Sequence, residues 1–152
     1  MAKENASITS TTKRSRFQIV LYMIAALISA AGLAEATYLT VISLTGETAV
    51  CGGSASCFEV LGSKYAKIFG IPVAGLGAIA YFSAFTCATF AAFGYRRARL
   101  LLALTIGAMF LVTLWLLFVQ AFLLHAFCRY CLFSAAMIFL LAGIVISQPA
   151  SD

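Results

Sequence analysis

Charged residues are scarce in this chain. Of its 152 residues only 10% are charged, whereas 63% are hydrophobic and the mean hydropathy is +1.04. A soluble domain of this size needs far more charge to cover its surface, so the composition excludes that class. The length allows about four membrane-spanning helices of roughly 20 residues each and leaves no room for a separate soluble domain. The sequence shows no internal repeat and no low-complexity tract.

The few basic residues lie mainly in two short clusters. One cluster, which includes Arg14 and Arg16, precedes the first apolar segment, and the other, Arg96 to Arg99, separates the second from the third. Clusters of this kind set membrane topology, with the basic side in the cytoplasm, and they predict no nucleic-acid partner. We therefore expect both termini in the cytoplasm, and the stretch 45–70 and the turn near His125 on the outer side.

Four apolar segments predict an all-α fold, an integral membrane four-helix bundle. Residues 17–146 would form the four-span catalytic domain, with a disordered cytoplasmic tail at 1–16 and a short cytoplasmic tail at 147–152. The expected spans are Phe17–Leu44, Ile71–Gly94, Leu100–Leu123 and Cys128–Ile146.

An alternative reading treats residues 1–36 as a secretory signal that ends in the small-x-small site Ala34-Glu35-Ala36. The apolar core of this segment, about 17 residues, is longer than the usual 7–15 of such signals. Removing it would also spoil the four-span bundle.

Four of the five cysteines form two pairs, Cys51/Cys57 and Cys128/Cys131. The expected topology places both pairs on the outer side, where disulfides form in a bacterium or an organelle lumen. Two pairs that open and close would relay electron pairs, although fixed structural disulfides or a zinc site remain alternatives. Cys87 lies within the second span, where a lone cysteine is expected to be packing.

The outer loop contains the capping box Ser56-Cys57-Phe58-Glu59, which predicts a helix from Cys57 to Gly70. This helix is too short to span, so we expect an amphipathic interfacial helix between spans 1 and 2. Its apolar face would carry Phe58, Leu61, Tyr65, Ile68 and Phe69. Cys57 would sit in the first turn, where the helix dipole favours the reactive thiolate.

The second pair is a C-x-x-C motif at the outer start of the fourth span. Three-residue spacing places the sulfurs of Cys128 and Cys131 on nearly the same helix face, which permits a reversible local disulfide. Arg129 and His125 add positive potential. Beyond Gln120 the spans offer few polar residues, which argues against a transporter or channel.

These motifs, in this order, resemble the vitamin K epoxide reductases and their bacterial homologues over about Gly32 to Leu140. The resemblance implies a four-helix transmembrane bundle around a quinone such as ubiquinone, menaquinone or phylloquinone. The residues that carry it are Tyr38-Leu39-Thr40, Cys51, Cys57, Val60 to Ala66, Phe69-Gly70-Ile71-Pro72, Leu76 to Tyr81, Cys128 and Cys131.

The resemblance also implies a role for each cysteine. Cys131 would lie next to the quinone ring, Cys128 would exchange with Cys57, and Cys51 would meet the outside reductant. Ser63 matches a family serine placed near this centre.

The chain departs from the animal enzymes at one position that contacts vitamin K. Those enzymes carry a tyrosine four residues after the second C-x-x-C cysteine, where this chain has Ala135 beside Ser134. A bacterial-type role in forming disulfides in exported proteins therefore fits better than epoxide or quinone reduction for its own sake, which stays the alternative. The resemblance implies a separate thioredoxin-like partner, a bacterial inner membrane or its equivalent, and a monomer.

A quinone needs a largely apolar pocket with few polar anchors. The side chains expected to line it, besides Cys131 and Ser63, are Tyr81, Trp115, Ser134, Ala135 and Met137. Glu35 is the one acid inside an apolar run, and a proton-handling role for it stays open beside an ordinary interfacial one. His125 is expected to be an interfacial residue.

Overall fold

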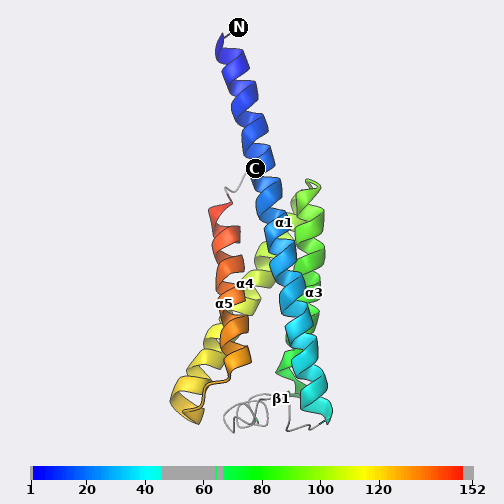
Figure 1. Ribbon diagram of the computed structural model, residues 1–152, viewed down its shortest axis with the longest axis vertical. Coiled ribbons are helices and arrows are strands. Elements are labelled where there is room, and N and C mark those ends of the chain that lie inside the picture. The colour runs from blue at the N-terminus through cyan, green and yellow to red at the C-terminus, as the bar shows by residue number, and fades with distance from the viewer. Residues whose placement is uncertain (1, 46–63, 65–66, 149–152) are drawn as a thin grey trace.

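The chain folds as a bundle of membrane-length helices. The computed structural model describes residues 2–45, Lys64 and 67–148, with side chains from Arg16 onward. Its helices are α1 (Ala2–Thr45), α3 (Val73–Ala92), α4 (Arg96–Phe118), η3 (Val119–Leu124) and α5 (Arg129–Ser147), as Figure 1 shows. Four segments are long and apolar enough to cross a membrane, namely Arg16–Thr45, Val73–Ala92, Arg96–Leu124 and Arg129–Ser147. The predicted all-α four-span bundle is confirmed.

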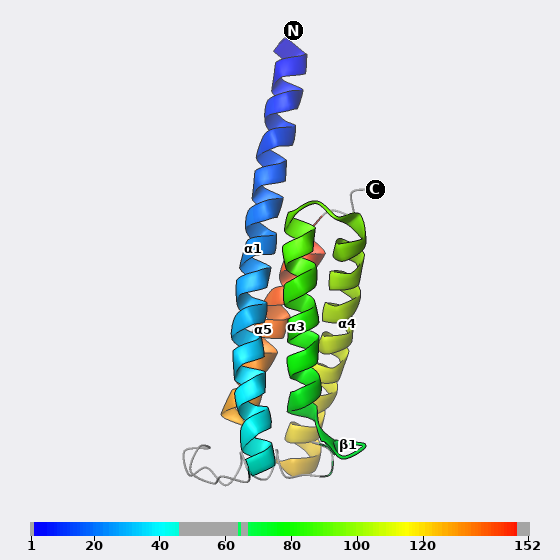
Figure 2. The same cartoon turned by 90° about the vertical axis from the view of Figure 1, so that its right-hand side faces the viewer.

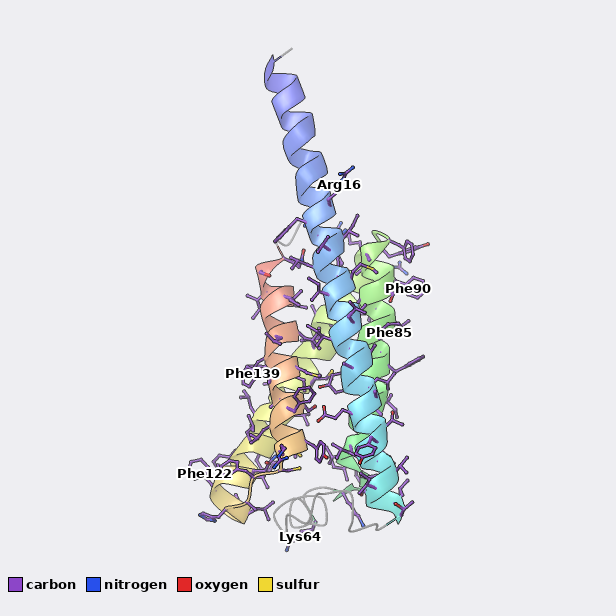
Figure 3. All side chains as sticks on the ribbon, viewed as in Figure 1. Arg16, Lys64, Phe85, Phe90, Phe122 and Phe139 are labelled. Carbon is purple, nitrogen blue, oxygen red and sulfur yellow. The ribbon has the colours of Figure 1, made fainter. Side chains whose placement is uncertain are left out.

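The outer faces of the helices are apolar. Between 17% and 28% of the most apolar window of each span is buried inside the bundle, so most of each span faces outward. Aromatic side chains such as Phe90 and Phe122 lie exposed on these faces (Figure 3). Lipid is the solvent that such surfaces require, and there the backbone must satisfy its own hydrogen bonds, as a helix does. Hydroxyls in the spans follow the same rule: Thr86 Oγ1 donates to the Phe82 carbonyl at 2.9 Å.

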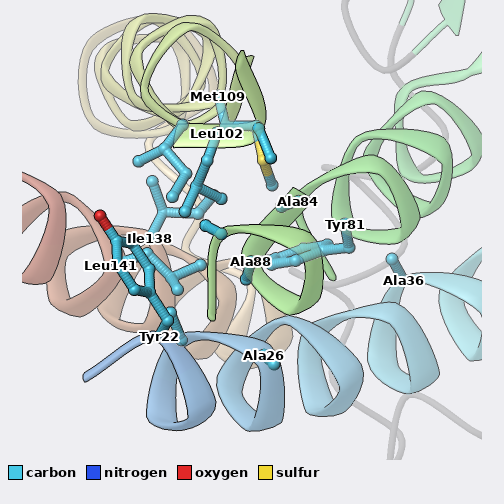
Figure 4. Close-up of a cluster of buried hydrophobic side chains, with 14 residues drawn as sticks. Tyr22, Ala26, Ala36, Tyr81, Ala84, Ala88, Leu102, Met109, Ile138 and Leu141 are labelled. Atoms are coloured by element: carbon cyan, nitrogen blue, oxygen red, sulfur yellow. The ribbon is translucent and has the colours of Figure 1, made fainter. Parts of the chain in front are cut away.

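Small residues bring α1 and α3 close together, and this is the most extensive helix pair of the bundle. Figure 4 shows the buried cluster at this contact, where alanines of both helices meet side chains of α4 and α5. Its small members from α1 and α3 are Ala25, Ala26, Ala36, Ala84, Ala88 and Ala91. Because lipid provides little hydrophobic force between spans, close approach through small side chains is the main source of packing energy. The first span is thus an integral part of the bundle. Its removal as a signal would take away the α1 side of this contact.

Both ends of the bundle are distinct in Figures 1 and 2. The N-terminal part of α1, the α3–α4 connection and the end of α5 lie at one end, while β1 and η3 lie at the other. Residues 2–16, expected to be a tail, form the start of α1, which begins at Ala2 and runs on past the bundle (Figure 1). The apolar span has already nucleated this helix, so no further nucleation step is needed. Each added residue costs only its own conformational entropy and gains one hydrogen bond.

The predicted interfacial helix is wrong at its C-terminal end. Strands β1 (Lys67–Ile68) and β2 (Ile71–Pro72) pair antiparallel with Ile68 opposite Ile71. The turn between them has φ of 53° at Phe69 and 81° at Gly70, the double positive φ of a tight hairpin turn. Pro72 is the N-cap of α3 rather than its first turn. The remainder of the predicted helix, apart from Lys64, lies outside the described residues.

A π-helical turn interrupts the third span, and the sequence did not predict it. η3 follows α4 directly and ends at Leu124, and its C-cap residue His125 has a left-handed φ of 48°. Turns of this kind are rare and often accompany functional sites. This one lies immediately before the C-x-x-C motif.

Candidate functional site

The C-x-x-C motif forms the start of α5. Cys128 is the N-cap residue, with an extended backbone at φ −88° and ψ 122°, and the helix itself begins at Arg129. The carbonyl of Cys128 accepts the first helical bond, from the N–H of Leu132 at 3.0 Å. Cys131 is therefore in the first helical turn and bears a free thiol. The predicted placement of this pair at a helix N-terminus is confirmed, one residue later than expected.

The two sulfurs of this motif interact directly. The Cys131 thiol donates a hydrogen bond to Cys128, and this bond is the main reason that the pKa of Cys128 is lowered to about 6. The backbone N–H groups of Cys131 and Tyr130 lower it further, while burial of Cys128 opposes the shift. At neutral pH Cys128 is thus a thiolate that Cys131 holds in place, and the thiolate is the form that reacts in disulfide exchange.

Gln120 holds the segment that leads into the C-x-x-C motif through two hydrogen bonds. It is 2% exposed, and its side-chain Oε1 accepts a hydrogen bond from the N–H of Cys128 at 3.2 Å. Its backbone carbonyl accepts from the N–H of Ala126 at 3.2 Å. Gln120 therefore binds two residues, Ala126 and Cys128, of the segment that leads to the first cysteine of the motif. These two hydrogen bonds connect the π-helical turn to the site.

A cavity of about 470 Å³ lies beside the motif. Every helix of the bundle and the hairpin contribute to its wall, which is predominantly apolar. Four of the predicted pocket residues line it, namely Tyr81, Cys131, Ser134 and Ala135. Volume and lining are those of a site for a small, largely apolar molecule.

Tyr81 and Ser134 join α3 to α5 at the cavity wall. The Tyr81 hydroxyl lies 2.8 Å from Ser134 Oγ and donates to the Ser134 carbonyl at 3.3 Å. Gly32 of α1 lies against this ring: a Cβ there would stand 2.5 Å from Tyr81 Cζ, far inside normal contact. Gly32 on the first span thus leaves room for the ring of Tyr81, which lines the cavity.

Two predicted pocket residues do not line the cavity. Trp115 is 57% exposed and stacks on Phe118 on the outer face of the third span, with ring centroids 6.2 Å apart. Met137 lies on α5 two positions beyond Ala135, about 200° around the helix, so it faces away when Ala135 faces inward. The structure therefore does not bring Trp115 or Met137 to this cavity.

The loop pair Cys51 and Cys57, together with Ser63, lies outside the described residues. His125 is exposed, as expected of an interfacial residue, and does not line the cavity. Cys87 packs partly buried against the core, in keeping with its predicted packing role.

Two residues of the site escaped the sequence reasoning. Gln120 drew notice as a polar residue in a span, and that was the available signal, but its bond to Cys128 depends on the π-helical turn. Gly32 carried no signal beyond being a glycine in a span, because its role rests on contact with a ring from another helix.

Comparison with known proteins agrees with this geometry. The chain has no significant match among curated protein sequences. Residues 23–146 match the model of the vitamin K epoxide reductase family, a range that covers most of all four spans and includes both cysteine pairs. The chain therefore belongs to the vitamin K epoxide reductase family.

Proposed function

We propose that this protein is a membrane thiol–disulfide oxidoreductase that passes electron pairs from an outside dithiol, through Cys51/Cys57 and then Cys128/Cys131, to a membrane quinone. The family in general consists of membrane oxidoreductases of thiol–disulfide and quinone chemistry. The observation that carries the proposal is the reactive C-x-x-C at the wall of an apolar cavity, with Cys131 lining it.

The residues around the cavity fit a quinone. The wall is apolar except for a few groups that can hold ring oxygens, chiefly the hydroxyls of Tyr81 and Ser134 and the carboxyl of Glu35. When bound, a quinone supplies a two-electron acceptor. Ala135 lines the cavity where the animal enzymes have a tyrosine, so no hydroxyl projects from that position, and this favours the disulfide-forming role over epoxide reduction.

The relay consists of thiol–disulfide exchanges. A dithiol of the partner attacks the Cys51–Cys57 disulfide and releases the Cys57 thiolate. That thiolate attacks Cys128 of the oxidised C-x-x-C, and Cys131 leaves as the thiolate at the cavity wall. The second thiol of the partner attacks the bond that joins the partner to Cys51, so the partner leaves as a disulfide and Cys51 is freed as a thiolate. Cys51 then attacks Cys57 of the mixed disulfide, and the low pKa of Cys128 makes Cys128 the better leaving group.

The bundle also suggests where the relay lies in the membrane. The start of α1 and the start of α4, which begins at Arg96, lie at the end of the bundle opposite the start of α5 (Figure 1). With the basic end in the cytoplasm, both cysteine pairs face outward, where a separate thioredoxin-like protein is the expected dithiol donor. We propose that the active unit is a monomer, since the cavity is built by one chain.

A reconstitution experiment tests this function. Purified protein in nanodiscs is given a reduced thioredoxin-like protein and a short-chain ubiquinone or menaquinone, and quinol is followed by absorbance. The wild type should reduce quinone, and each of the four single Cys→Ala variants should lose nearly all activity, while Cys87→Ala, the matched control, keeps it. Full activity in Cys128→Ala or Cys131→Ala would refute the proposal.

A further inference from the structure

One acidic side chain lies within the spans. Glu35 of α1 lines the same cavity as Tyr81, Cys131 and Ser134. In the part of the chain that the structure describes, the other acid, Glu4, precedes the first span, so Glu35 is the only acid within the described spans. An ionisable group inside a membrane bundle is costly, and it is kept where it serves a function.

The carboxyl of Glu35 is unsatisfied. Both of its oxygens are buried, and among the described residues neither has a hydrogen-bond partner. Three polar side chains of the same wall already have partners: Tyr81 pairs with Ser134, and Gln120 accepts from the N–H of Cys128. A buried carboxyl with a structural role is normally hydrogen-bonded. The bonding capacity of Glu35 is therefore open to a molecule in the cavity.

The surroundings of Glu35 favour the neutral acid. Moving an isolated carboxylate out of water costs far more free energy than moving the protonated form. The titratable groups close enough to interact with it electrostatically are Cys128, Cys131 and Tyr81, and none of them carries positive charge. A carboxylate here would also repel the Cys128 thiolate, whereas a neutral acid would not.

We propose that Glu35 is a catalytic proton donor, whose carboxyl hydrogen-bonds to an oxygen of the bound quinone and supplies one of the two protons of the quinol. This role rests on the proposed quinone chemistry of the same cavity. As the Cys128–Cys131 disulfide forms, the two sulfurs give up two electrons, the Cys131 thiol gives up one proton and Glu35 gives up the other. Both electrons and both protons end on the quinol. The negative charge that began on the Cys128 thiolate ends on the Glu35 carboxylate, which regains a proton from water.

Three variants of the full chain separate this role from a structural one. Glu35→Gln keeps the shape and the hydrogen-bonding capacity but has no acidic proton, and Glu35→Leu loses both. Thr37→Val is the matched control, because Thr37 is an exposed residue of the same helix, bonded to the Leu33 carbonyl and outside the cavity lining. Each variant is assayed with a short-chain ubiquinone and a short-chain menaquinone.

For Glu35→Gln we expect kcat to fall about 100-fold or more, as for loss of a general acid, with KM for quinone within about threefold of wild type. Glu35→Leu should lower kcat and also raise KM, and Thr37→Val should change neither. The mixed-disulfide exchange between the protein and its reduced partner should stay at the wild-type rate in all three, which shows that the bundle is folded.

A second readout needs no turnover. In protein with Cys128 and Cys131 oxidised, addition of quinone should shift an infrared carboxylic-acid C=O band, and this band should be absent from Glu35→Gln and present in Thr37→Val. Wild-type kcat in Glu35→Gln, or a spectrum without a quinone-sensitive carboxylic-acid band, would overturn the role of Glu35. If the wild type reduced no quinone at all, the proposed function itself would fail, a result distinct from an active enzyme that tolerates Glu35→Gln.

Discussion

The contact between Gly32 and Tyr81 predicts a sharp sensitivity to a single methyl group. In Gly32→Ala the new Cβ would stand 2.5 Å from Tyr81 Cζ and 2.6 Å from Cδ1. Carbon atoms pack best about 3.5–4.0 Å apart, so the ring must retreat by about 1 Å. A shift of this size is enough to break the 2.8 Å contact between the Tyr81 hydroxyl and Ser134 Oγ.

The energetic cost follows from these two changes. Overpacking of a close-packed contact costs about 1–3 kcal/mol, and loss of the hydrogen bond adds about 1 kcal/mol. Alanine in place of a helical glycine also gains about 0.5–1 kcal/mol of backbone entropy, which partly offsets the loss. Gly107→Ala and Gly143→Ala are matched controls that share the gain alone, since a Cβ at either position meets nothing within 4 Å. The difference between Gly32→Ala and these controls should thus be about 2–4 kcal/mol.

The assay is the free energy of unfolding in detergent micelles, with quinone KM measured beside it. Gly32→Ala should be less stable than either control and should bind quinone more weakly, because Tyr81 leaves its place at the cavity wall. Combining Gly32→Ala with Tyr81→Leu should remove most of the penalty, since the ring that clashes is gone, and the double-mutant cycle isolates this coupling. Equal stability of Gly32→Ala and Gly107→Ala would refute the reasoning.

Three further predictions concern the site. Gln120→Leu leaves the buried N–H of Cys128 without its acceptor, so the free energy of unfolding should fall by about 1–3 kcal/mol, measured by denaturant titration in micelles; no loss of stability would contradict the bond. In protein that lacks Cys51 and Cys57, the rate of alkylation of Cys128 should rise with pH to a plateau, with a midpoint near pH 6, because its pKa is lowered to that value. Cys131→Ala should move this midpoint upward. A midpoint near 8.5 in the parent protein would contradict the hydrogen bond from Cys131 to Cys128. Trp115→Phe should leave quinone KM unchanged, whereas Ala135→Leu, which fills the cavity, should raise it severalfold in steady-state assays; the reverse order would refute the position of the cavity.

Hydropathy predicted the spans because membrane helices must bury their backbone and expose apolar side chains, and both demands are local. Local sequence also placed Cys128 and Cys131 at the start of a helix. The two cysteines are three residues apart at the edge of an apolar run, and few other structures fit that pattern. The hairpin at Lys67–Pro72 escaped prediction because Phe69 adopts a positive φ that its side chain does not signal. Ile68 and Phe69 matched a helical period, but Ile68 pairs across the strands with Ile71 and Phe69 lies in the turn.

The choice of cavity residues shows a different limit. Spans that are apolar on all sides contain no pattern that separates a lipid-facing aromatic such as Trp115 from a buried one such as Tyr81. That distinction comes from the rotation of each helix in the bundle, which is set by small residues such as Gly32 and by the bond from Tyr81 to Ser134. Glu35 stood out in the sequence as an acid in an apolar run, but its unsatisfied position at the cavity wall is visible only in three dimensions.

The relay between the two cysteine pairs is tested most directly by trapping its mixed disulfide. Cys131→Ala cannot close the C-x-x-C bond, so in membranes treated with a thiol-blocking reagent it should accumulate a Cys57–Cys128 cross-link, identified by mass spectrometry of the joined peptides. The same cross-link should appear in Cys51→Ala, and it should be absent from Cys131→Ala when Cys57 is also replaced. A Cys131→Ala protein in which Cys128 is only ever found as a thiol or joined to Cys51 would contradict the account.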